Sequence, residues 1–216
     1  MLVGHFAAGF VAKRVEPRIS LGTFVLAAIL PDLLWGLFLV AGIEHVYFKR
    51  GKGAAKYLAS ADIGISHSLL MDAIWAALFA AAYFLLRHYA RGAWVLFGAV
   101  LSHWLLDFVS LAVPLAPGEQ RQIGLGLWYS IPLTLIVEGG FWLLALILYV
   151  RVTHPRKRVG VYGFWIVAAL LTLVWYNNIA GPPPPNPRTA PIASEILFLL
   201  VVLWAFWMNR LRPARV

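Results

Sequence analysis

The feature that most constrains this chain is a series of apolar runs, each long enough or nearly long enough to cross a lipid bilayer. The runs cover residues 21–42, 65–86, 92–113, 132–150, 159–176 and 192–208. A helix needs about 20 apolar residues to span the hydrocarbon core, and it satisfies its backbone polar groups internally. The sequence therefore predicts an all-α fold, a polytopic transmembrane helical bundle of about six spans.

The composition supports this fold class. Of the 216 residues, 62% are hydrophobic, whereas soluble domains contain about 45–50% apolar residues. We therefore expect one integral-membrane domain over residues 1–216, with the candidate site in 1–114 and additional membrane helices in 128–216. The chain has no cysteine, which excludes disulfide bonds and thiolate metal ligands.

Some segments depart from a simple series of straight spans. Residues 1–15 are apolar but too short to cross the bilayer, so they are predicted to form a short re-entrant or interfacial helix, or a lead-in to the first span. Pro31 and Asp32 interrupt the first span, and a proline without its N–H predicts a kink there. Residues 44–60 form a polar connection, and the prolines in 181–187 predict a stiff polyproline segment.

The net charge of +9 comes from Lys and Arg residues that lie mainly in the short segments between apolar runs. This placement indicates contacts with anionic membrane lipid and a topology signal, and it disfavours nucleic acid as a partner. Twelve of the 18 basic residues fall on one side of the predicted membrane. The positive-inside rule then places both termini in the cytoplasm. The sequence makes no prediction about the oligomeric state.

Ionisable residues inside the spans are the candidates for function. His103 and Asp107 are four residues apart, so they lie on one face of a helix. An ionisable residue at the centre of a membrane helix costs about 2.5–3.5 kcal/mol, which favours a shared partner. His5, Asp32 and His67 lie in three other segments of the same half. The five residues are predicted to meet in one polar site within the bundle.

This set of three imidazoles and two carboxylates suits a divalent metal, with zinc first and manganese or iron as alternatives. Five donors exceed the needs of one tetrahedral zinc, so either two metals share them or one donor has another role. Simpler roles are also open. His103 with Asp107 can form a plain hydrogen-bonded pair, and Asp32 and the Ser66–Ser68 segment can cap helices.

Three acidic residues stand outside this set. Glu138 lies well inside the fourth span and is the candidate for a catalytic acid or base, or for a residue that supports the metal ligands. Asp72 and Glu195 lie nearer the ends of their spans. Both are predicted to have structural roles and to reach water.

Four short motifs carry a resemblance to a known family. The chain has Gly4-His5, Pro31-Asp32, Ser66-His67-Ser68, and Ser102-His103 followed by Asp107, in this order. This series resembles the YdjM-type bacterial inner-membrane proteins, which are described as membrane-bound metal-dependent hydrolases. The resemblance covers about the first half of the chain, to Pro114, and it implies location in the bacterial cytoplasmic (inner) membrane.

The resemblance also implies a ligand set. The family's metal ligands would correspond to His5, Asp32, His67, His103 and Asp107. Three positions depart from the family pattern: Leu34 replaces a second aspartate, Asp62 stands where the family has a histidine, and Leu111 lies where some relatives have a further histidine. These departures disfavour a full two-metal site and leave a one-metal site or an inactive version of it as the alternatives.

The residues and the resemblance together lead to three hypotheses. The first is a metal-dependent hydrolase that activates water and acts on a lipid-like ester or phosphoester. The second is a transporter or channel that passes metal ions or protons along the same residues. The third is a membrane scaffold in which the buried polar residues only hold helices together.

Overall fold

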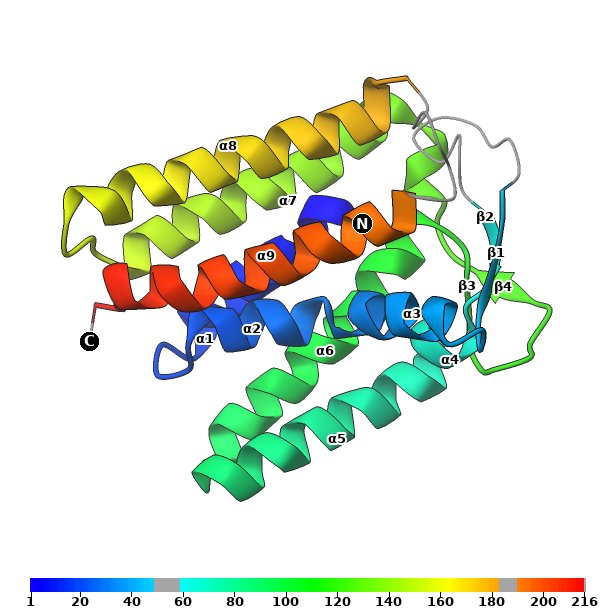
Figure 1. Cartoon of the computed structure of the whole chain (residues 1–216), viewed down its shortest axis with the longest axis horizontal. Helices are drawn as coiled ribbons and strands as arrows, with labels where there is room; N and C mark the ends of the chain where they lie inside the picture. The colour runs from blue at the N-terminus through cyan, green and yellow to red at the C-terminus, as the bar shows by residue number, and fades with distance from the viewer. Residues whose placement is uncertain (49–58, 183–189, 216) are drawn as a thin grey trace.

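The computed structural model describes residues 1–48, 59–182 and 190–215 as a bundle of helices with two small β-hairpins at one end (Figure 1). The helices are α1 (Leu2–Val15), α2 (Leu21–Ala28), α3 (Leu30–Val40), α4 (Gly64–His67), α5 (Leu69–Arg87), α6 (Ala90–Ser110), α7 (Ile131–Val152), α8 (Arg158–Ala180) and α9 (Ala190–Leu211). Strands β1 (His45–Phe48) and β2 (Ala59–Asp62) pair antiparallel, as do β3 (Val113–Pro114) and β4 (Gln122–Ile123).

Five of these helices are long and apolar enough to cross a membrane: α5, α6, α7, α8 and α9. The pair α2 and α3 passes the same test when taken together and counts as a sixth, bent span. The predicted all-α, polytopic bundle of about six spans is therefore confirmed.

The predicted kink in the first span is present. The axes of α2 and α3 differ by 56°, and the break lies at Ile29. Pro31 stands in the first turn of α3, where its missing N–H costs no helical hydrogen bond. The break leaves Asp32 in the first turn of α3, where the partial positive charge of the helix N-terminus favours a carboxylate.

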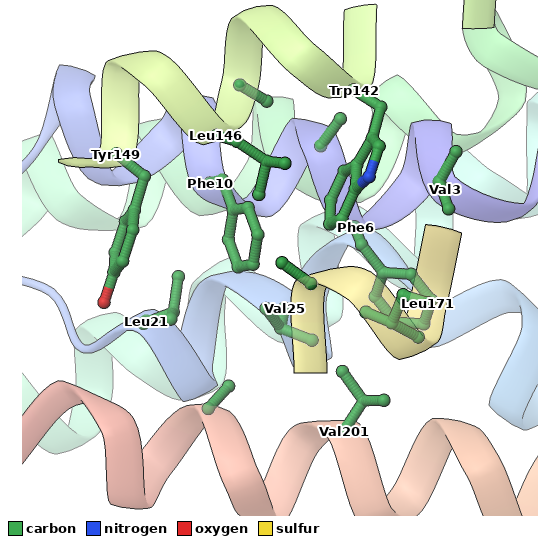
Figure 2. Packing of buried hydrophobic residues seen from close by; sticks show 14 of the residues in the cluster. Val3, Phe6, Phe10, Leu21, Val25, Trp142, Leu146, Tyr149, Leu171 and Val201 are labelled. Carbon is green, nitrogen blue, oxygen red and sulfur yellow. The ribbon is translucent and has the colours of Figure 1, made fainter. Parts of the chain in front are cut away.

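Helix α1 forms the centre of the bundle. Its side chains Val3, Phe6 and Phe10 are at most 1% exposed, and they pack among residues of α2, α7, α8 and α9 (Figure 2). The rings of Phe10 and Trp142 stack with centroids 5.4 Å apart. Of the alternatives for residues 1–15, this enclosed position disagrees with the interfacial helix, while the re-entrant helix and the lead-in to the first span stay predictions.

The two parts expected along the chain, residues 1–114 and 128–216, pack into one another. Helix α1 packs against α7, and α2 packs against α9, so helices from residues 1–114 and 128–216 share one apolar core. The interlocked arrangement brings the polar residues of the first part under the cover of the second.

Some local features differ from the expected spans. The second span begins at Leu69 and not at residue 65, because Ser68 caps α5 and separates it from the short helix α4. The connection 44–60 carries a β-hairpin, although residues 49–58 are outside the described part of the chain. Most of the predicted polyproline segment 181–187 also lies outside the described residues.

The two ends of the bundle differ in character. The β-hairpins lie where α3 and α6 finish, and the carboxyl end of α9 lies at the other end (Figure 1). At that other end Glu16 accepts hydrogen bonds from the Tyr89 hydroxyl and the backbone N–H of Arg18. Burial raises the pKa of the Glu16 carboxyl, but these hydrogen bonds and the charge of Arg91 hold it below its usual range. This cluster joins α1 to the α5–α6 hairpin.

Candidate metal centre

The structure brings all five predicted donor residues together from four helices. His5 comes from α1, Asp32 from α3, His67 from α4, and His103 and Asp107 from α6. Two groups of three are close enough to hold a metal ion, namely His5–His103–Asp107 and Asp32–His67–His103. In each group one ligand atom per residue lies within 4.8 Å of the others. His103 belongs to both groups and stands at the centre of the cluster.

One face of the cluster is formed by four atoms. His67 Nε2 lies 3.4 Å from Asp32 Oδ1 and 3.9 Å from Asp107 Oδ2. His103 Nε2 lies 3.7 Å from Asp32 Oδ1 and 3.4 Å from Asp107 Oδ2. Ligands about 2.0 Å from a tetrahedral zinc are separated by about 3.3 Å. Two of these four separations are close to that value, and the other two, at 3.7 Å and 3.9 Å, are longer.

His5 lies on the other side of His103. The two imidazole rings are stacked, with centroids 3.7 Å apart and planes 7° from parallel. His5 Nε2 is 3.1 Å from Asp107 Oδ1, and the amino group of Met1 lies 2.9 Å from the first atom and 2.6 Å from the second. Asp107 thus directs one oxygen to His5 and the Met1 amino group, and the other oxygen to His67 and His103.

The contacts of His103 indicate which of its nitrogens is available to a cation. His103 Nδ1 is 2.8 Å from the carbonyl oxygen of Ala28, an atom that can only accept, so Nδ1 carries the hydrogen. In the neutral ring the lone pair is then on Nε2. That atom is buried and has no hydrogen-bond partner among the described residues, although it faces two carboxylates.

This donor set fits a divalent cation. A lone pair directed at two carboxylate oxygens is unfavourable unless a proton or a cation lies between them, and the Met1 amino group, 2.6 Å from Asp107 Oδ1, compensates part of the buried negative charge. Neutral imidazole nitrogens and carboxylate oxygens are ligands that zinc, manganese and iron accept. The break at Ile29 contributes to this fit, because it brings the Ala28 carbonyl to His103.

Glu138 belongs to α7, and its side chain contacts the first turn of α1 beside the donor cluster. Its Oε1 accepts a hydrogen bond from the backbone N–H of Gly4 at 3.2 Å, and its Oε2 accepts one from the Trp128 indole at 3.1 Å. The side chain is fully buried. These contacts fix the first turn of α1, which carries His5, and the catalytic role of Glu138 stays a prediction.

The remaining acidic residues have distinct surroundings. Asp72 was expected to reach water, but it is fully buried, and its Oδ2 accepts a hydrogen bond from the backbone N–H of Trp104 at 3.1 Å. It therefore joins α5 to α6. Glu195 of α9 lies against Gly36 of α3, where a Cβ atom would overlap its carboxyl group. Its Oε1 is buried and has no hydrogen-bond partner among the described residues.

Sequence reasoning missed Glu44, which is connected to the donor cluster through Ser66. Glu44 is buried and binds Ser66, whose hydroxyl oxygen lies 2.7 Å from His67 Nδ1. Glu44 stands in a polar connection 22 residues before Ser66, so no helical or strand spacing relates the two. The only signal in the sequence was an acidic residue close to the end of a span.

A comparison with protein families agrees with this arrangement. The model of the YdjM inner membrane protein family matches residues 1–180. The chain belongs to the YdjM family of inner membrane proteins. The match extends well past the four motifs that end near Pro114 and includes α7 and α8, which enclose α1. No curated protein and no solved structure matches the chain.

Proposed function

We propose that this YdjM family member is a membrane-embedded, metal-dependent hydrolase. The observation that carries the proposal is the position of His103 Nε2, which lies 3.4 Å and 3.7 Å from two carboxylate oxygens without a hydrogen-bond partner among the described residues. This is an arrangement that a bound cation would complete. We propose His5, Asp32, His67, His103 and Asp107 as its ligand set, with zinc as the first choice of metal.

Within this set each residue has a part that follows from its contacts. Asp32, His67 and His103 form one of the two groups of three that are close enough to hold a cation, and His5, His103 and Asp107 form the other. His5 also stacks on His103 and lies 3.1 Å from Asp107 Oδ1, which limits rotation of both side chains. A bound divalent cation would lower the pKa of a water ligand to about 7 and would polarise an ester or phosphoester.

The membrane setting supports a substrate with a lipid tail. The donor residues lie on helices of an apolar bundle, and Asp32 retains a side-chain exposure of 17%, the largest in the set. A substrate headgroup can therefore approach from the side of α3. Its acyl chain would remain beside the exposed apolar residues of the neighbouring spans, such as Leu37 and Leu70.

The surroundings of α1 favour a hydrolase over a carrier. A path for ions needs polar groups that continue through the bundle. After His5, α1 instead presents Phe6 and Phe10, which belong to the apolar core with Trp142 and Tyr149. Along this helix the polar groups of the site therefore do not continue directly past His5.

Elemental analysis of the purified protein tests the proposal. We expect bound zinc in the wild type and loss of most of it in His103→Ala and in Asp32→Asn, a substitution that preserves the shape of the side chain. His154→Ala is the matched control, because His154 is exposed and lies in the α7–α8 connection. Equal metal content in the wild type and His103→Ala would contradict the proposal.

A second measurement separates the hydrolase from the other hypotheses. The zinc-loaded protein in vesicles should cleave lipids that contain carboxylic ester or phosphoester bonds, and Asp107→Asn should lose this activity. Metal flux across the vesicle membrane without cleavage would favour a carrier. Reduced stability of His103→Ala, with no metal in the wild type, would favour a scaffold.

A further inference from the structure

A buried chain of hydrogen bonds lies behind His67, on the side away from the donor cluster. Ser66 Oγ donates to Glu44 Oε2 at 2.6 Å, and the same oxygen lies 2.7 Å from His67 Nδ1. Glu44 is 2% exposed and Ser66 is fully buried. The chain connects a loop residue after α3 to a proposed metal ligand on α4.

The second oxygen of Glu44 is also fully used. Glu44 Oε1 accepts hydrogen bonds from the backbone N–H groups of Ile65 and Ser66, at 2.8 Å and 2.9 Å. A carboxylate in this position has two fixed oxygens, and both accept. The contacts therefore hold Glu44, and with it the hydrogen of the Ser66 hydroxyl, in one orientation.

Counting hydrogens in this chain places a hydrogen on Nδ1 of His67. A serine hydroxyl has one hydrogen, and an ionised carboxylate can only accept, so the Ser66 hydrogen points to Glu44. Ser66 Oγ must then accept from His67 Nδ1–H. Nε2 is the ring atom that faces the donor cluster, 3.4 Å from Asp32 Oδ1, with which it forms a hydrogen bond, and 3.9 Å from Asp107 Oδ2.

We propose that Glu44 and Ser66 are positioning residues that keep a hydrogen on His67 Nδ1 and so present Nε2 to a cation. The role given to Glu44 and Ser66 rests on the proposed metal site. The hydrogen bonds that they form are present without a metal. A ligating histidine that donates its other N–H to an oriented acceptor holds its metal more tightly, and loss of such a partner typically costs 10–100-fold in affinity.

The variant Glu44→Gln gives the sharpest test. The amide has a single oxygen, which the two backbone N–H groups of Ile65 and Ser66 require. Its NH₂ group would therefore face Ser66 Oγ and donate to it. The Ser66 hydroxyl would turn toward His67 Nδ1, which would then accept a hydrogen bond and carry no hydrogen.

Nitrogen NMR of the metal-free protein with labelled histidine would detect this change. We expect His67 to carry a hydrogen on Nδ1 in the wild type and none on Nδ1 in Glu44→Gln. A wild-type His67 without a hydrogen on Nδ1, or the same state of Nδ1 in both proteins, would overturn the inference. The result does not depend on whether the protein binds metal.

Zinc titration of the purified protein supplies a second readout. We expect Ser66→Ala to weaken zinc binding roughly 10–100-fold and Ser66→Thr, which keeps the hydroxyl, to restore it. Ser68→Ala is the matched control, since Ser68 accepts from Met71 N–H and caps α5 without an interaction with His67 in the described contacts. Circular dichroism would show whether each variant keeps its helix content.

The outcomes separate the two proposals. No zinc binding by the wild type would refute the proposed metal site, while the NMR result would still decide the role of Glu44. Normal zinc binding by Ser66→Ala beside a zinc-binding wild type would refute the positioning role and leave the metal site in place.

Discussion

His103 shows how one residue can organise a polar site inside a membrane protein. Its ring is fully buried, stacks on His5 and lies with a centroid distance of 5.1 Å from the ring of His67. Its two nitrogens have different partners, a backbone carbonyl on one side and two carboxylates on the other. Both carboxylates face Nε2 of His103, and this atom carries a lone pair when the ring is neutral. A proton or a bound cation at Nε2 would supply the positive charge that the two carboxylates require.

Glu138 provides a prediction at the scale of the residue. We expect Glu138→Ala to lower the free energy of unfolding by about 1–3 kcal/mol, because it leaves the Gly4 N–H and the Trp128 indole without acceptors. Glu138→Gln keeps one acceptor oxygen and should lose less. Thermal unfolding of the detergent-solubilised protein would measure the difference. Loss of hydrolysis in Glu138→Gln at wild-type stability and metal content would instead support the predicted catalytic role.

At the scale of the element, the bundle combines one short central helix with one broken span. Helix α1 has 14 residues and carries a donor on its first turn and apolar side chains on the next turns. The break between α2 and α3 brings Asp32 and the Ala28 carbonyl to the same place as His103. A straight, unbroken span would pair that carbonyl with its own helix.

The contact between α2 and α9 supplies a prediction at this scale. A Cβ atom at Gly22 would overlap the ring of Phe206, whereas a Cβ atom at Gly98 on α6 would meet nothing within 4 Å. We expect Gly22→Ala to destabilise the protein by about 1–3 kcal/mol through overpacking. The matched substitution Gly98→Ala should be neutral or slightly stabilising, since alanine favours a helix. Equal unfolding midpoints for the two variants would argue against close packing of α2 on α9.

For the whole molecule, the donor cluster and the basic residues lie toward different ends. The donors come from the first turn of α1, the start of α3, the short helix α4 and the last two turns of α6. Most Lys and Arg residues stand in the turns at the end of the bundle where α9 finishes (Figure 1). Helix α1 starts among the donors and runs toward this basic end. The cytoplasmic position of both termini stays a prediction.

The positive-inside rule then predicts that the cluster faces away from the cytoplasm. The chain has no cysteine, so single cysteines can report on this without other changes. A membrane-impermeant maleimide should label Gln120→Cys, near β4, in intact cells, and should label Arg156→Cys only after the cells are opened. Both positions are exposed in the structure. The reverse pattern would place the cluster on the cytoplasmic side.

The sequence by itself determined the class of the protein and which residues are the candidate donors. Apolar length fixes the number of spans, because a bilayer imposes one dimension on every helix that crosses it. The five donor residues could be chosen because an ionisable side chain in a span is costly and needs a partner. The kink at Pro31 was predictable for a similar local reason, the missing N–H of proline.

Only the tertiary structure decided how these pieces meet. It placed α1 at the centre of the bundle, which no property of a 14-residue apolar segment specifies. It also brought Glu44 to Ser66 and the Ala28 carbonyl to His103, contacts between residues 22 and 75 positions apart. Such contacts depend on how helices pack and break, and a spacing rule along one helix cannot encode them.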